Sequence, residues 1–358
     1  MNELEQALQW FVEDKRIMAC LTVTGGTADR ACHAACGRIR EKEASGEDVP
    51  LGEDTLFDLA SLTKIFTGMA VLRLREEGLL DLSRPVTAYA PQFAHLGEVS
   101  VERVLTFSVG LTSPARIDAQ PTREEGLRQL FLTMPQPLGT GRYYSDMHAM
   151  VLKYVAEGAA GESFFDCLSR RILRPLGMRN TFAHVPQGER RRAASCDLEH
   201  RIEGTRHILR RGIAPGTVHD PKARLLSLEG KDLCGHAGLF ATRGDMVRFC
   251  QGVLRGQVLS RESLRFLAQN RTGRPLPEGG YTQYLGCQCY VKHPDQFFSE
   301  IPVYMGEQAF GLSGFTGHHL AIDPERGLFS LFLGDRVLNR LTVLRPPAGM
   351  TLTDFGLD

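Results

Sequence analysis

The chain has 358 residues, of which 42% are hydrophobic and 23% are charged, a composition typical of a soluble globular protein with one large or two closely joined domains. Lys plus Arg and Asp plus Glu number 42 each, so no overall field favours nucleic acid or an anionic membrane. No stretch is apolar enough to predict a membrane span. We therefore expect neither nucleic acid nor a membrane as a partner.

The cysteines predict a reducing compartment. There are nine, an odd number, scattered through apolar runs, which is typical of buried free thiols rather than of a disulfide framework. If Met1 is the native start, the absence of an export signal after it predicts a cytoplasmic protein, whereas a removed signal would predict a secreted one. Cys32 with Cys36, and Cys287 with Cys289, could be zinc ligands, but buried strand thiols are the preferred interpretation and we expect no metal.

The predicted elements begin with an amphipathic helix over residues 3–14. Strand patterns occupy residues 17–24, 30–39, 286–291, 309–313, 317–322 and 327–334, and we expect them to join in one antiparallel sheet. The sequence from Ser61 to about residue 266 predicts mainly helices and loops, with a long loop over the site at residues 186–229. Pro346 and Pro347 exclude a helix interior near the C-terminal end.

A single S-x-x-K motif joins Ser61 to Lys64 at the start of a predicted helix that Gly78 would end. Helical spacing places the Lys64 amine beside the Ser61 hydroxyl. A serine hydroxyl is a poor nucleophile until a base takes its proton, and a lysine can act as that base only where burial or positive charge lowers its pKa. The backbone N–H of Ser61 could hold an oxyanion. An N-cap serine with a solvated lysine is the alternative for an isolated match.

Residues 54–64 (DTLFDLASLTK) resemble the nucleophile segment of the serine β-lactamase and penicillin-binding-protein superfamily, in the class C-like branch that also contains esterases and D-aminopeptidases. The likeness runs from about residue 3 to about 340. It implies an α+β fold, a mostly antiparallel sheet flanked by helices with an inserted all-helical domain. The sheet domain would hold residues 1–60 and 275–358 and the helical domain 61–274, with the active site in the cleft between them.

A second motif lies at residues 141–146 (GRYYSD), which resemble the family's Y-x-N element. The resemblance implies that Tyr144 shares the Ser61 proton with Lys64 and later protonates the leaving group, with the positive charge of Lys64 helping the tyrosine to ionise. Asp146 replaces the commoner Asn, which donates to a substrate amide. An ionised carboxylate can only accept, so Asp146 could instead pair with Lys64. A buried tyrosine and a helix-capping aspartate are the alternative.

The third motif fits best at residues 311–317 (GLSGFTG), against G-H-T-G-F-T-G in the family. Ser313 and Gly314 match substrate-binding positions, and the N–H of Phe315 would be the second oxyanion donor. Leu312 stands where a Lys or His normally binds a substrate carboxylate, and a leucine side chain cannot hydrogen-bond. We therefore expect an uncharged ester or amide as substrate, with weak or no β-lactamase activity.

Three further histidines are candidates for the site. His318 and His319 are the nearest substitutes for the missing cation, although a position on the strand surface is favoured for each. Residues 218–220 (VHD) and 234–242 (CGHAGLFAT) resemble paired segments of penicillin-binding-protein-4B-like proteins. His236, in the second segment, could contact the substrate or could be a structural histidine.

Taken together, these motifs predict a serine hydrolase that acts through an acyl-enzyme on a small ester, amide or peptide. The resemblance implies no metal and no organic cofactor. The alternative is a catalytically silent binding or scaffold protein on the same fold, suggested by Leu312, Asp146, and Phe107 and Val109 where the family commonly has a His and a second Ser. The spacing of the serine, lysine and tyrosine argues against it, because a binding module has no need for that spacing. The sequence leaves the oligomeric state open.

Overall fold

The computed structural model describes residues 3–42, 46–139, 143–197, 199–203, 206–210, 212–227 and 232–338. The predictions made for Gly141, Arg142, Pro346 and Pro347 lie outside these ranges.

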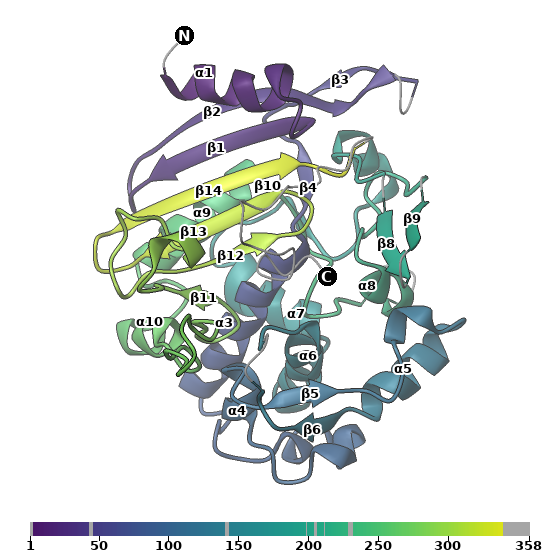
Figure 1. Ribbon diagram of the computed structural model, residues 1–358, viewed down its shortest axis with the longest axis vertical. Helices are drawn as coiled ribbons and strands as arrows, with labels where there is room; N and C mark the ends of the chain where they lie inside the picture. The colour runs from purple at the N-terminus through teal and green to yellow at the C-terminus, as the bar shows by residue number, and fades with distance from the viewer. Residues whose placement is uncertain are drawn as a thin grey trace.

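A seven-stranded sheet forms one side of the molecule (Figure 1), in the order β11-β12-β13-β14-β1-β2-β3. Every neighbouring pair is antiparallel, and β14 lies next to β1, so the C-terminal strands join the N-terminal ones directly, as the sequence predicted. The strands are β1 Cys20–Gly26, β2 Ala31–Arg40, β3 Val49–Pro50, β11 Tyr290–Val291, β12 Phe310–Gly314, β13 His318–Asp323 and β14 Leu328–Asp335.

Both faces of this sheet are covered. Side chains alternate along a strand, and in β14 Phe332 packs with the cluster of helix α1, Glu3–Gln9, while Leu331 and Leu333 belong to the main core. Helix α9, Arg243–Leu254, contacts β13 and β14. The other helices are α3 Thr63–Glu76, α4 Val101–Leu105, α5 Arg123–Phe131, α6 Asp146–Ala160, α7 Phe164–Leu168, α8 Pro221–Leu226 and α10 Arg261–Ala268.

Helix α3 is the central element of the core. It is buried along nearly its whole length and packs against α6. Residues 63–72 are buried on every side of the helix, as expected for a helix in the middle of a protein rather than at its surface. Lys64 is nevertheless fully buried in its first turn. A lysine with no exposure needs a partner for its charge, so the start of α3 is the candidate position of a functional site.

Several short elements were not predicted. They are the sheet of β4 Leu56–Asp58, β10 Phe240–Thr242 and β7 Thr181–Phe182, and the pairs of β5 Gly110–Thr112 with β6 Met134–Gln136 and β8 Glu199–Glu203 with β9 Arg206–Arg210. Five of these seven strands have only two or three residues, too few to show a clear two-residue period. Short 3₁₀ or π segments occur at Trp10–Asp14, Ala60–Leu62, Val86–Ala88, Pro91–Leu96, Ile117–Ala119, Ser169–Leu173, Gln187–Arg192 and Gln296–Phe298.

Two sequence predictions need correction. The stretch 186–229 is not one long loop, because it carries the β8–β9 hairpin and α8, where the Asp220 side chain caps the helix by accepting from the N–H of Ala223. The predicted strand at 286–291 shortens to β11, since Gln288 has a φ of 59° and the N–H of Gly286 turns back to the carbonyl of Cys289. The division into two domains stays a prediction.

All nine cysteines are free thiols, and seven of them are buried. None of the helices within the described ranges has the length and apolar character needed to cross a bilayer.

Candidate active site

Ser61 lies in the 3₁₀ turn Ala60–Leu62, between β4 and α3. Ala60 has a φ of 46°, a left-handed conformation that costs a residue with a side chain about 1–2 kcal/mol. The buried Asp58 stabilises this backbone, since its Oδ1 accepts from the N–H of Ala60 at 3.0 Å and its Oδ2 accepts from the N–H of His219 at 2.7 Å. The strained turn therefore has a dedicated support, and it fixes Ser61 at the beginning of α3.

The hairpin of β12 and β13 is attached to the same turn. Thr316 Oγ1 donates to the carbonyl oxygen of Asp58 at 2.7 Å, and Nε2 of His318 lies 2.6 Å from that oxygen. Gly314 leaves no room for a side chain, because a Cβ there would lie 2.8 Å from the carbonyl oxygen of Leu59. These contacts bring the third sequence motif against the turn that carries the serine.

The remaining positions of the third motif differ in exposure. Phe315 is 46% exposed, and its ring stacks on that of His219 with 5.5 Å between centroids. Ser313 is exposed and donates to Glu300 Oε2 at 2.5 Å. Leu312 is only 1% exposed and belongs to the main hydrophobic core. Ser313 and Phe315 are thus accessible to a ligand, whereas the side chain of Leu312 is closed off from solvent.

His318 is a structural residue rather than a substitute cation. Its Nδ1 accepts from the N–H of Gly334 at 3.2 Å, so Nε2 carries the proton and donates to the carbonyl oxygen of Asp58. Burial lowers the pKa of His318 to about 4, so the ring is neutral. It is also not the surface residue that the strand pattern favoured. His319 is half-buried, with Nε2 at 2.7 Å from the carbonyl oxygen of Glu300.

Lys64 connects the predicted catalytic residues. Its Nζ donates to Ser61 Oγ at 2.9 Å, lies 2.7 Å from Asp146 Oδ1, and donates to the carbonyl of His236 at 3.3 Å. The ring centroid of Tyr144 is 4.8 Å from the same nitrogen. Burial acts to lower the pKa of Lys64, but Asp146 and Tyr144 outweigh it and the pKa is raised. Lys64 is therefore a charged ammonium that donates to the serine.

Tyr144 is held by its neighbours just before α6. Its backbone N–H donates to Gln283 Oε1 at 2.9 Å. Its ring stacks on Phe107 at 5.7 Å and on Tyr290 at 5.6 Å between centroids. Phe107, which stands where the family commonly has a histidine, thus forms one wall for Tyr144 and fixes the position of its ring.

The charges around Asp146 form a longer chain. Lys222 Nζ lies 2.7 Å from Asp146 Oδ2 and 4.0 Å from Asp220 Oδ2, and Asp220 Oδ1 lies 2.8 Å from Nε2 of His236. Positive and negative groups therefore alternate from Lys64 through Asp146, Lys222 and Asp220 to His236. Burial would raise the pKa of Asp146, but the charges of Lys64, Lys222 and His236 hold it well below its usual range.

His236 is part of this chain and almost fully buried. Burial acts to lower its pKa, but the Asp220 carboxylate outweighs that effect and raises the pKa to about 10, so the ring is charged at neutral pH. Of the two sequence alternatives, the geometry fits a residue that acts within the protein, through Asp220 and Lys64, better than a direct substrate contact.

Asp146, Asp220 and His236 could together hold a metal ion, because one ligand atom from each lies within 4.8 Å of the others. The ammonium of Lys222 already lies against both carboxylates. A divalent cation would have to displace it, so this set of residues fits the lysine better than a metal.

Sequence reasoning did not assign Asp220 and Lys222 to the site. The usable signal was the Asp220-Pro221 pair, which is typical of a helix start and leaves Lys222 in the first turn. Nothing local indicated that this turn would meet α6.

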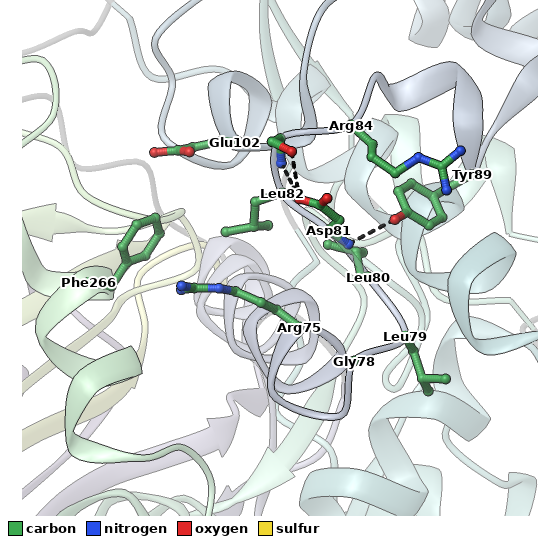
Figure 2. A pocket seen from close by; sticks show the side chains of 11 residues that line it. Arg75, Gly78, Leu79, Leu80, Asp81, Leu82, Arg84, Tyr89, Glu102 and Phe266 are labelled. Atoms are coloured by element: carbon green, nitrogen blue, oxygen red, sulfur yellow. Dashed lines mark hydrogen bonds between the residues drawn. The ribbon is translucent and has the colours of Figure 1, made fainter.

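Two hollows lie near α3 and α6. One of about 630 Å³ is at the far end of α3 (Figure 2), where Arg75 points toward the ring of Phe266. Ser61 precedes the first turn of this 14-residue helix, so the two ends are about 20 Å apart. The other, of about 400 Å³, is lined by Tyr144 and Asp146 and adjoins the candidate site.

This fold, together with a serine accompanied by a lysine at the start of a buried helix, defines a class of serine hydrolases that work through an acyl-enzyme. The chain belongs to the Beta-lactamase family, whose model matches residues 19–342. The predicted family and α+β fold are confirmed, while the parts played by single residues stay predictions.

Individual relatives agree with this assignment. The N-acetylmuramyl-L-alanine amidase of Bacillus subtilis (strain 168) is 27% identical over 304 residues, which cover 76% of this chain and 66% of the amidase, so the chain spans about two thirds of that relative. A penicillin-binding protein homologue from Caulobacter crescentus superposes with a TM-score of 0.71 at 20% identity, covering 93% of this chain and 90% of the other. A class C beta lactamase from Rhodobacter sphaeroides gives 0.68 at 19%, covering 94% of both chains.

Proposed function

We propose that this protein is a serine hydrolase that forms an acyl-enzyme on Ser61 with a small ester or amide. The observation that carries the proposal is the 2.9 Å contact between Lys64 Nζ and Ser61 Oγ, made by a lysine that is fully buried. Burial of a lysine is unfavourable unless its charge is used or paired. Here the ammonium is paired with Asp146 and also donates to the hydroxyl of Ser61, which lies on a strained turn.

The proton of Ser61 needs an acceptor other than Lys64, since Lys64 is an ammonium in this arrangement. Tyr144 lies against the same ammonium and is the candidate base. Beside that ammonium, the Tyr144 oxygen would act as the general base that takes the proton as Ser61 Oγ attacks the carbonyl, and would return the proton to the leaving group. Water would then release the acyl group from Ser61.

The developing oxyanion would be held by the N–H groups of Ser61 and Phe315. Gly314 and Thr316 flank Phe315, and both contact the segment that carries Ser61. The side chain of Asp146 accepts from two lysines and has no N–H to donate to a substrate amide. We therefore expect esters to react faster than amides, and β-lactams to react slowly.

Covalent labelling tests the proposal. A fluorophosphonate probe should add one adduct to the intact protein, at Ser61, and Ser61→Ala should remove it. Ser83→Ala, which changes an exposed surface serine, is the matched control and should keep the adduct. An adduct at another residue would refute the assignment of the nucleophile.

A silent binding protein is the second candidate, favoured by the two lysines that occupy Asp146. A folded wild-type protein that neither reacts with the probe nor hydrolyses any nitrophenyl ester would support this alternative and refute the hydrolase.

A further inference from the structure

Strand β12 supplies no cation at position 312, but two cations lie beside Tyr144 and Asp146. The hollow of about 400 Å³ that these two residues line is also lined by Arg116, Lys222 and Ser113. We call this hollow the Arg116–Lys222 pocket. Lys222 comes from α8 and Arg116 from the segment before the 3₁₀ turn Ile117–Ala119.

Arg116 is far more accessible than the carboxylate with which it pairs. The side chain of Arg116 is 58% exposed, while its partner Asp118, at 2.7 Å, is 8% exposed. Arg116 can therefore keep this ion pair and still present N–H groups to a ligand, because a guanidinium has five donors. Lys222 is 25% exposed, so its ammonium also reaches the hollow.

The two cations can bind an anion without losing their carboxylate partners. Lys222 Nζ lies 2.7 Å from Asp146 and 4.0 Å from Asp220, and Arg116 pairs with Asp118 at 2.7 Å. An ammonium has three N–H donors and a guanidinium five, more than one carboxylate partner occupies. A substrate carboxylate that accepts from both side chains would form charge-assisted hydrogen bonds, which are stronger than neutral ones.

We propose that the Arg116–Lys222 pocket binds a carboxylate of the substrate while the scissile carbonyl lies at Ser61. The inference rests on the proposed hydrolase activity and revises the substrate class, from the uncharged ester expected because of Leu312 to a carboxylate-bearing ester or amide. A short linker between the carboxylate and the scissile carbonyl suits the separation of Lys222 from Ser61. Asp146 and Lys64 connect these two residues, by contacts of 2.7, 2.7 and 2.9 Å. Arg116 supplies the bidentate geometry that suits a carboxylate.

The test compares two esters that differ in one group. The 4-nitrophenyl monoester of glutaric acid carries a carboxylate where 4-nitrophenyl valerate carries a methyl, and the succinic and adipic monoesters cover neighbouring lengths. Each monoester is compared with the neutral 4-nitrophenyl ester of the same chain length. For the wild type, the ratio of kcat/KM for the charged ester to kcat/KM for the neutral ester should exceed one for at least one length. Arg116→Gln should lower this ratio about tenfold, the usual effect of losing one charge-assisted hydrogen bond. Arg84→Gln, in the separate hollow of Figure 2, should leave the ratio unchanged.

Failure of this inference can be told apart from failure of the proposed function. If valerate is hydrolysed but no monoester is preferred, or if Arg116→Gln keeps the wild-type ratio, the pocket assignment is wrong and the hydrolase stands. If no ester reacts and Ser61 is not labelled, the hydrolase is wrong. Calorimetric titration with glutarate then decides the pocket, because binding that Arg116→Gln weakens would support it and an absence of binding would overturn it.

Discussion

Replacing Asp146 by Asn tests the electrostatics of the site most directly. Asn keeps an oxygen that can accept from Lys64 but removes the negative charge that lies 2.7 Å from its ammonium. Since that charge is a main reason why the pKa of Lys64 is raised, the substitution should lower it. We expect the high-pH limb of the kcat/KM profile, which reports loss of the Lys64 ammonium, to move to lower pH.

The size of the shift follows from burial and distance. An opposite charge within a few ångströms changes a pKa by about 1–3 units, and one unit corresponds to about 1.4 kcal/mol. Lys64 is fully buried and Asp146 is about one quarter exposed, so solvent screens the pair only in part. We therefore expect a clear displacement of the limb to lower pH, within the general range for losing an adjacent opposite charge. The Asn amide should also improve amide substrates relative to esters, because it adds a donor.

The assay is the pH dependence of nitrophenyl ester hydrolysis between about pH 6 and 11, corrected for spontaneous hydrolysis. Asp232→Asn is a matched control, because Asp232 lies 3.1 Å from Lys153, another buried lysine, and has the same side-chain exposure as Asp146. The control should leave the profile in place. A profile that Asp146→Asn leaves unchanged or moves to higher pH would show that Lys64 does not govern that limb.

Acid and steric changes give further predictions. Burial lowers the pKa of His148 and of His318 to about 4, so the unfolded state binds more protons than the folded state between about pH 6.5 and 4. Urea unfolding should therefore show the free energy of unfolding falling as the pH falls across that window, by up to about 3 kcal/mol per histidine. The fall should be smaller in His318→Gln. His236 has a pKa raised to about 10, so its contribution, present at neutral pH, should be lost as pH rises through about 10, and His236→Gln should flatten that alkaline loss. In Gly314→Ala the new Cβ would lie 2.8 Å from the carbonyl oxygen of Leu59 and would push β12 from the serine turn; kcat should fall about tenfold or more in a protein that still folds, and an unchanged kcat would refute this view of the turn.

Local spacing was the reliable part of the sequence prediction. Ser61 and Lys64 are three residues apart in a helical pattern, and helical geometry alone brings their side chains together. The long strands β12 to β14 were also found from their patterns, within one residue at each end. In each case the interaction or period lies within one element, so a short window of sequence contains the information.

Contacts between distant segments were not predictable in the same way. Lys222 contacts Asp146 although the two residues are 76 positions apart in the sequence, and Lys222 lies in a region interpreted as a loop. His318 was expected on the strand surface, yet it is buried because the hairpin folds onto the carbonyl of Asp58. Such positions depend on how elements pack. No periodicity in the sequence encodes that arrangement, although the helix-capping Asp220 marked where α8 would begin.

Leu312 provides a final test of how this site differs from its family. If the missing cation were the only obstacle to β-lactam hydrolysis, Leu312→Lys would restore it. The structure predicts otherwise, because Leu312 is 1% exposed within the main hydrophobic core, and a lysine there would bury a charge among apolar neighbours. We expect Leu312→Lys to lower the free energy of unfolding by about 3 kcal/mol or more without creating nitrocefin hydrolysis. Leu312→Met, a change of similar volume, should cost less than about 1.5 kcal/mol. A stable Leu312→Lys variant that hydrolyses nitrocefin would show instead that position 312 faces the substrate, and that the Arg116–Lys222 pocket is not needed to bind a carboxylate.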